Sequence, residues 1–269
     1  MSSLADIPSE NKCKQIFYEV THGGLTTCSC GQSIIWKTNR NYGWCKYCRR
    51  KIFPKSRTFF SSSNLSCSQI FQLIWCWQNR QSPGSTKNIL GIGYPAVRRW
   101  YKALREHLLP NDLTKLCGIV EVDEAYFGKR RYGNQTIVIG AIERIPDPIT
   151  KTKRLKLQII PDTESETLEQ FIETSIESGS LVVTDCHGGY NDIEWLGYSH
   201  ETWNHSKGHY AGTNHIEQTW SAMKRYLRKL YGNIPTRNIQ LILNEWEARH
   251  NQPELFISPQ EYLRWVVRD

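Results

Sequence analysis

The sequence predicts an α/β protein in which helices flank a mixed sheet and two smaller segments precede it. From about residue 115 onward, apolar runs rich in β-branched residues alternate with amphipathic stretches, a pattern typical of strands and helices in turn. Before that point, residues 1–60 are polar, cysteine-bearing and rich in turns, and residues 61–112 carry aromatic and basic residues at helical spacing. We therefore expect three parts, at residues 1–60, 61–112 and 113–269.

The third part begins with three expected strands and ends with two expected helices. Between them we expect a helix around Thr167, a short buried strand, a second helix and a fifth strand. In chain order, the strands are expected at residues 118–126, 136–142, 155–160, 181–184 and 201–204, and the closing helices at 214–230 and 236–250. Three meandering strands followed by helices that alternate with strands suit a mixed sheet covered by helices. This order has the arrangement of a ribonuclease-H-like core.

The charge balance is basic, with 34 Lys and Arg against 26 Asp and Glu and a formal net charge of +8. Such an excess favours a polyanionic partner, because each cation near a phosphate releases a counterion, although a merely soluble basic protein fits it equally well. No stretch approaches the roughly 20 apolar residues that cross a bilayer, and the N-terminus lacks the apolar core of a secretory signal. We expect no membrane association and a reducing compartment, where the nine cysteines favour metal ligands over disulfides.

Two close-spaced cysteine pairs, CSC and CKYC, are separated by 14 residues. Four thiolates at such a spacing predict a tetrahedral Zn²⁺ site, a small zinc ribbon that depends on the metal for its stability. The expected ligands are Cys28, Cys30, Cys45 and Cys48. The CxC pair is tighter than usual, so Cys13 or His22 could replace one of its members; unligated cysteines in a loop are the alternative. Basic residues crowd the second pair and favour phosphate contacts: Lys46, Arg49, Arg50, Lys51, Lys55 and Arg57.

Residues 68–80 and the stretch that opens at Pro95 have helical patterns, separated by a short segment and a glycine turn. A helix, a turn and a second, basic helix are typical of a helix-turn-helix-like DNA-binding segment. The second helix places its basic residues away from its apolar stripe, and these are Arg98, Arg99, Lys102 and Arg105. A helix pair that only connects the first part to the third is the alternative.

Three acids lie at positions that suit a metal site. Asp123 shares one face of the first expected strand with Glu121, and a carboxylate within an apolar strand is costly unless it is paired or holds a metal. Asp185 directly follows a buried strand, and Glu217 lies near the start of a helix. Three carboxylates on three elements suit Mg²⁺ and phosphoryl transfer, although spacing alone fits surface acids and helix caps as well.

The motifs VEVDEAYFGKRRYG, TDCHGGYND, NHS and TNHIEQTWSAMKRYLRKLYG resemble those of the DDE transposases of bacterial insertion sequences. The branch that the chain resembles also includes the eukaryotic Merlin elements. The likeness runs from the CSCG and CKYC pairs through TFFSSSNLS to NEWEARHN near the C-terminus. The chain departs from the family in its first cysteine pair, which is usually CxxC. Cys30 matches the family's second cysteine, and the resemblance leaves open whether Cys28 is a ligand.

The resemblance implies that Asp123, Asp185 and Glu217 bind Mg²⁺ or Mn²⁺ and are catalytic. Supporting positions are implied for Asn204, His205, Asn214 and Lys224. With the basic segments described above, the expected DNA-binding residues are Arg49, Arg50, Lys51, Arg98, Arg99, Lys102, Lys224 and Arg225.

The implied function is DNA transposition. The enzyme binds the terminal inverted repeats, cuts the element's ends by hydrolysis, and joins the 3′-hydroxyls to target DNA without a covalent enzyme intermediate. A homo-oligomer is expected in the synaptic complex, in the cytoplasm at the nucleoid if the host is prokaryotic and in the nucleus if it is eukaryotic. A nuclease or junction resolvase on the same fold, or a domesticated DNA-binding protein with an inert core, are the alternatives.

Overall fold

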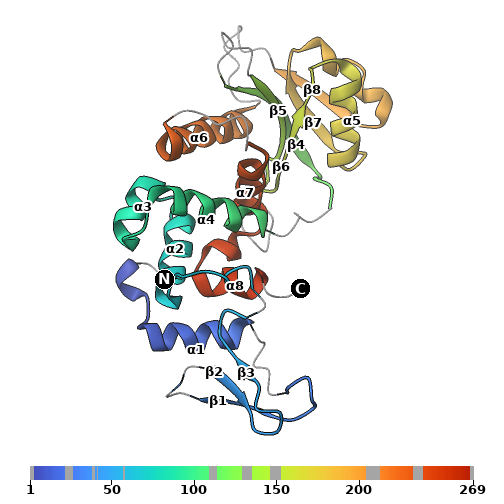
Figure 1. Ribbon diagram of the computed structural model, residues 1–269. Coiled ribbons are helices and arrows are strands. Elements are labelled where there is room, and N and C mark those ends of the chain that lie inside the picture. Colours follow the sequence, from blue (N-terminus) through green and yellow to red (C-terminus); the bar gives the residue numbers. More distant parts are fainter. Residues whose placement is uncertain are drawn as a thin grey trace. The chain divides into compact units, whose positions relative to one another are not determined.

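A computed structural model of the protein describes residues 3–21, 27–37, 40, 42–56, 58–108, 114–128, 135–145, 153–203, 213–232 and 239–266. The chain forms two compact units (Figure 1). The first unit is Met1–Leu109 together with Glu254–Asp269, and the second, the α/β unit, is Pro110–Pro253.

The first unit contains five α-helices and a three-stranded sheet among its described residues. The α-helices are α1 (Glu10–Thr21), α2 (Cys67–Gln78), α3 (Pro83–Leu90), α4 (Tyr94–Glu106) and α8 (Pro259–Val266). The strands are β1 (Ile34–Lys37), β2 (Tyr42–Cys45) and β3 (Lys51–Ile52), and short 3₁₀ turns lie at η1 (Leu4–Asp6) and η6 (Pro253–Phe256). The strands pair antiparallel in the order β1-β2-β3. We call residues 27–52, which hold this sheet, the ribbon.

Local sequence signals explain the three helices that follow the ribbon. Ser66 caps α2 through a capping box with Gln69, and Ser82 caps α3, whose first residue is proline. Gly91 ends α3 in the left-handed region, with φ of 66°, where glycine carries no steric penalty. The expected pair of helices joined by a glycine turn is therefore present, and α3 adds a helix between them.

The core of the first unit joins both ends of the chain. Phe17 of α1 packs with Phe60 and Phe71, and Tyr262 of α8 donates a hydrogen bond to the backbone oxygen of Leu104 at 2.8 Å. From the sequence, α8 is expected to belong to the third part, whereas its buried Tyr262 and Leu263 complete the core of the first unit. Residues 1–60 are likewise expected to be turn-rich throughout, whereas α1 is a regular helix with its apolar side chains in this core.

The α/β unit is built on a five-stranded mixed sheet with the order β6-β5-β4-β7-β8. Its strands are β4 (Ile119–Phe127), β5 (Thr136–Glu143), β6 (Leu155–Ile160), β7 (Leu181–Asp185) and β8 (Ser199–Trp203). Its helices are α5 (Ser165–Ser175), α6 (Asn214–Tyr231) and α7 (Ile239–Asn251), with 3₁₀ turns η3 (Gly188–Tyr190) and η4 (Ile193–Leu196). The first three strands are antiparallel, and β7 and β8 are parallel to β4.

Helices cover both faces of this sheet, with α5 and α6 on opposite sides (Figure 1). Val120 and Val122 of β4 point to the core beneath α5, and Ala125 and Phe127 point to the core beneath α6 and α7. Because side chains alternate along a strand, Glu121 and Asp123 lie on the α6 face.

The predicted α/β architecture, a mixed sheet flanked by helices, is confirmed. One local expectation was wrong: the segment between the fourth and fifth strands forms two 3₁₀ turns instead of an α-helix. In the described part of the chain, no helix is both long enough and apolar enough for a membrane crossing.

Candidate active site

The pairing of β4 with β7 brings two of the three predicted acids together. These parallel strands pair Val120 with Val182 and Glu121 with Val183. This ladder ends two residues before Asp123 and Asp185. Side chains alternate along a strand, so Asp123 shares the face of Glu121 and Asp185 shares the face of Val183. Asp185 also adds to the rise in the pKa of Asp123, so the two acids are near enough to interact electrostatically.

Asp123 is held by α6 and is surrounded by negative charge. Trp220 of α6 donates its indole N–H to Asp123 Oδ2 at 3.1 Å. Burial raises the pKa of Asp123 to about 7, and the neighbouring carboxylates of Glu124, Asp185 and Glu217 add to the rise. Asp185 of β7 and Glu217 of α6 therefore both lie near enough to Asp123 of β4 to influence its charge.

Asp185 stands at the carboxyl end of β7, where the chain turns into η3. The backbone N–H of His187 donates to Asp185 Oδ1 at 2.9 Å, an Asx-type turn that orients the carboxylate. The ring Nδ1 of His187 in turn accepts the backbone N–H of Gly189 at 3.2 Å. The DCHGG turn thus fixes Asp185 by local hydrogen bonds while leaving it partly exposed.

Glu217 lies in the first turn of α6, one helical turn before Trp220. Thr213 donates its hydroxyl to Glu217 Oε1 at 3.1 Å. Glu217 is exposed, whereas Asp123 is half-buried. We call Asp123, Asp185 and Glu217 the acidic site.

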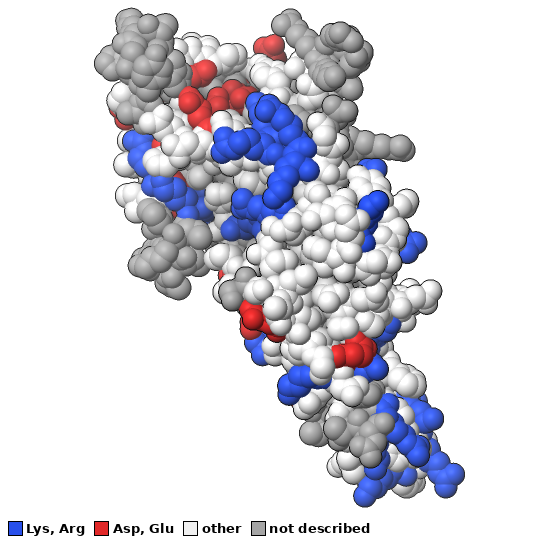
Figure 2. Space-filling model, turned by 90° about the vertical axis from the view of Figure 1, so that its left-hand side faces the viewer, with Lys and Arg blue, Asp and Glu red and all other residues white. Residues whose placement is uncertain are grey.

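Three further predicted positions also lie on α6. Asn214 is its first residue, Lys224 is half-buried with its ammonium 5.5 Å from the centre of the Phe127 ring, and Arg225 is exposed. In the upper part of Figure 2, where the α/β unit lies, Lys and Arg side chains adjoin acidic ones. The other two supporting positions, Asn204 and His205, lie outside the described residues.

The ligand atoms of the acidic site are less closely grouped than those of the four cysteines. Among described residues, only Cys28, Cys30, Cys45 and Cys48 form a group whose ligand atoms all lie within 4.8 Å of one another. The three carboxylates supply oxygen ligands only, which suits a hard cation such as Mg²⁺ that also keeps several waters. The donor chemistry of the site therefore fits a divalent ion.

Two further acids border the site, and the sequence alone assigned neither of them a role. Glu121 of β4 is fully buried and accepts hydrogen bonds from the start of α6. Glu124 lies on the opposite face of β4, where it accepts the hydroxyl of Tyr190, and burial raises its pKa. The two-residue spacing between Glu121 and Asp123 signals their shared face, but no local pattern reveals the helix that meets Glu121.

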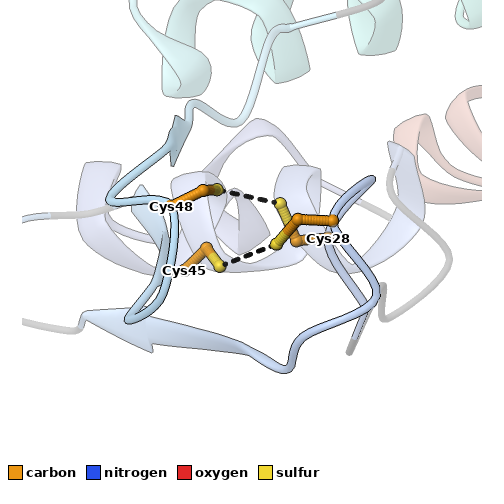
Figure 3. Close-up of side chains that lie close together, drawn as sticks. Cys28, Cys45 and Cys48 are labelled. Atoms are coloured by element: carbon orange, nitrogen blue, oxygen red, sulfur yellow. Dashed lines mark hydrogen bonds between the residues drawn. The ribbon is translucent and has the colours of Figure 1, made fainter.

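The sulfur atoms of the four cysteines of the ribbon lie within 4.8 Å of one another, and Figure 3 shows Cys28, Cys45 and Cys48 pointing toward one another. The sulfur atoms of Cys28 and Cys48 are 3.4 Å apart, and those of Cys30 and Cys45 are 3.6 Å apart. Four thiolates at 2.3 Å from a tetrahedral Zn²⁺ lie about 3.8 Å from one another, so the donor set and its spacing are consistent with a zinc ribbon. Cys28 belongs to this group despite the CxC spacing.

The alternative ligand Cys13 lies elsewhere, in the helical core of the first unit. Its sulfur contacts the backbone oxygen of Pro8 at 3.2 Å, and burial raises its pKa to about 12. The thiolate is the form that binds metal, so both the position and the raised pKa of Cys13 argue against it as a ligand. His22 lies outside the described residues.

The basic residues of the first unit divide into exposed and structural groups. The predicted DNA-binding residues are all exposed, namely Arg49, Arg50, Lys51, Arg98, Arg99 and Lys102. Lys55 instead donates to the backbone oxygens of Ser63 and Leu65 at 2.6 and 2.9 Å. Arg105, expected on an outer face of its helix, is buried and packs over Tyr101. Lys55 and Arg105 therefore stabilise the fold of this unit, because their cationic groups are engaged by the protein itself.

Comparison with known proteins adds one finding. The family described as "ISXO2-like transposase domain" matches residues 115–251, a range that begins just before β4 and ends with α7. The match covers just over half of the 269 residues and contains Asp123, Asp185 and Glu217. No match to the chain is found among curated proteins.

Proposed function

Because the chain belongs to the ISXO2-like transposase family, we propose that it binds the ends of a DNA element and catalyses metal-dependent strand cleavage and strand transfer on a ribonuclease-H-like core. The observations that support this proposal are the parallel pairing of β4, which bears Asp123, with β7, which bears Asp185, and the hydrogen bond to Asp123 from Trp220 of α6, the helix that bears Glu217. The order of three antiparallel strands followed by two parallel ones supports the proposed core.

Asp123, Asp185 and Glu217 would hold Mg²⁺ or Mn²⁺. When bound, such ions activate the attacking oxygen and stabilise the leaving oxygen at the scissile phosphate. The protein's own part is to fix these oxygen ligands on three rigid elements. The pKa of Asp123 is raised first by burial and then by the neighbouring carboxylates, and a bound cation would offset both effects.

We assign DNA binding to the exposed cations. Arg49, Arg50 and Lys51 of the ribbon, held by Zn²⁺ at the cysteine cluster, and the basic face of α4 would bind the terminal inverted repeats. Exposed cations bind phosphates by counterion release. In the lower part of Figure 2, where the ribbon lies, Lys and Arg are the charged side chains that face the viewer. Lys224 and Arg225 would contact DNA near the cut, since they follow Glu217 on the same helix.

The test uses duplexes that carry the inverted repeats flanking this reading frame, end-labelled and mixed with the zinc-loaded protein, Mg²⁺ and a target plasmid. We expect joined product from the wild type and none from Asp185→Asn, which still binds the duplex. Asp192→Asn is the matched control, because Asp192 is exposed in the same unit and its replacement removes the same charge. Joining by Asp185→Asn would remove that residue from the site.

The same assay separates the alternative functions. A nuclease or junction resolvase on this fold would cut the labelled duplex without joining it to the plasmid. A DNA-binding protein with an inert core would shift the duplex without cutting it. Synapsis of two ends requires a homo-oligomer, so we expect joining to rise with more than the first power of protein concentration.

A further inference from the structure

Glu121 occupies an unusual position for an acid. It lies in the central strand β4, two residues before Asp123 on the same face, and its side chain is fully buried. A buried carboxylate is costly unless hydrogen-bond donors surround it. Here Oε1 accepts from Arg144 Nε at 3.1 Å and from His215 Nδ1 at 2.6 Å, and Oε2 accepts two backbone N–H groups of α6.

Those two amides belong to the open N-terminal turn of α6. His215 N lies 2.8 Å and Ile216 N lies 3.2 Å from Glu121 Oε2. In most helices the side chain of the N-cap residue accepts such amides. In α6 the N-cap residue, Thr213, makes no capping bond and donates its hydroxyl to Glu217 instead. The helix is therefore capped by the neighbouring strand, and the cap carries the negative charge that the helix dipole favours.

We propose that Glu121 is a positioning residue for the acidic site, because it clamps the first turn of α6 to β4 and so fixes Glu217 relative to Asp123. This inference rests on the proposed function. Strand β4 carries both Glu121 and Asp123, and the first turn of α6 carries both Glu217 and the amides that Glu121 accepts. The distance between Asp123 and Glu217 therefore depends on the hydrogen bonds from α6 to Glu121. Trp220 secures the next turn of the helix to the same strand through Asp123 Oδ2.

Glutamine is the informative replacement at this position. Each oxygen of Glu121 now accepts from two donors. The amide of Gln offers a single oxygen and an NH₂ group that can only donate. Whichever pair of donors the amide oxygen keeps, the other pair faces the NH₂ group, which cannot accept a hydrogen bond. Glu121→Gln therefore preserves the shape of the side chain but removes about half of the hydrogen bonds that it accepts.

A matched control lies in the neighbouring strand of the same sheet. Glu143 of β5 is also buried, accepts the backbone N–H of Cys117 at 2.9 Å and is paired with Arg154. Both of these partners lie outside α6. Glu143→Gln therefore reproduces the cost of removing a buried, arginine-paired carboxylate from the sheet and leaves the helix junction intact.

The experiment measures Mn²⁺ binding directly, by the electron paramagnetic resonance signal of free Mn²⁺ in titrations of the zinc-loaded, full-length protein without DNA. We expect binding by the wild type that Asp185→Asn abolishes. Replacing the partners that orient metal ligands typically weakens affinity about 10- to 100-fold, so we expect Glu121→Gln to raise the dissociation constant at least about 10-fold. Glu143→Gln should leave it unchanged at a comparable loss of thermal stability.

Amide exchange gives a second measurement that needs no metal. Protection of the peptide covering residues 213–220 should fall in Glu121→Gln and hold in Glu143→Gln, because only the first change exposes the amides of α6. If Glu121→Gln does not fold, His215→Ala replaces it, since this change removes only the ring contact with Oε1 and should weaken Mn²⁺ binding by a smaller factor.

Two failures are distinguishable. If the wild type shows no Mn²⁺ binding that depends on Asp185, the proposed function falls and the positioning role falls with it. If the wild type binds Mn²⁺ but Glu121→Gln binds it equally well, or weakens it no more than Glu143→Gln does, the acidic site stands and only the positioning role is overturned.

Discussion

Gly140 allows α6 to lie close to the sheet, and its replacement by Ala gives a quantitative test of this packing. Gly140 of β5 pairs with Asp123 across the antiparallel ladder. A Cβ atom at position 140 would lie 2.6 Å from Cη2 and 2.7 Å from Cζ2 of Trp220, and 2.9 Å from Cδ2 of Leu157. Ordinary contacts begin at 3.4 Å, so the indole must retreat by about 0.8 Å, the difference between 3.4 and 2.6 Å.

This shift has two costs. Overpacking a well-filled core typically destabilises by about 1–3 kcal/mol. A retreat of about 0.8 Å would also stretch the bond from Trp220 Nε1 to Asp123 Oδ2 beyond hydrogen-bonding range, since that bond is 3.1 Å long now. Its loss adds roughly 1–2 kcal/mol. We therefore expect Gly140→Ala to lower the free energy of unfolding of the α/β unit by about 2–5 kcal/mol.

The assay is urea unfolding followed by far-UV circular dichroism, in a double-mutant cycle with Trp220→Phe. A phenyl ring does not reach the positions of Cη2 and Cζ2, so Gly140→Ala should cost less than about 1 kcal/mol in the Trp220→Phe background. Gly84→Ala is the control: its nearest neighbour, Ser82 Oγ, is 3.8 Å away, and no destabilisation is expected. Equal costs of Gly140→Ala in both backgrounds would refute the proposed contact.

The cysteine cluster, His200 and Arg99 each provide a further test. Cys45→Ser should abolish zinc binding measured by atomic absorption and weaken binding to element ends, whereas Cys13→Ser should retain the metal; loss of zinc in the second variant would reassign the ligand set. Burial lowers the pKa of His200, which contacts Thr184 Oγ1 at 2.9 Å. As the pH drops below about 6.5, the imidazole of the unfolded chain is therefore protonated before that of the folded chain, and the free energy of unfolding should fall. In urea titrations His200→Gln should flatten this dependence of stability on pH, and an unchanged dependence would contradict the reasoning. Arg99→Ala should lower the slope of log affinity against log salt for DNA by about 1, and an unchanged slope would exclude a phosphate contact.

The strands of the α/β unit follow closely from local sequence. The apolar run that ends at Thr184 predicts β7 within one residue of its observed end, and the expected third strand coincides with β6. Such runs are informative because strands buried on both faces need continuous β-branched and aliphatic residues. The position of Asp185 at the carboxyl end of β7 could also be anticipated, since mixed α/β sheets open their clefts at such ends.

The packing between distant segments could not be predicted in the same way. Periodicity assigns Glu121 to a face but does not say which helix arrives there, because 94 residues separate it from His215. The same limit explains Lys55 and Arg105, which composition marks as solvent-facing and which the fold uses internally. Helix α1 was missed for another reason: Cys13, Phe17 and Val20 have helical spacing, but the turn-rich residues that follow obscured it.

The position of α6 decides whether the acidic site forms. Its first turn presents Glu217 and is capped by Glu121, and its second turn presents Trp220 to Asp123. Both anchors therefore end on β4, the strand that carries the first acid. A helix held by one anchor could pivot and change the distance from Glu217 to Asp123, whereas two anchors one helical turn apart restrict both its position and its rotation. Restriction of this kind is what a metal site on separate elements requires, since a displacement of about 1 Å is enough to impair catalysis.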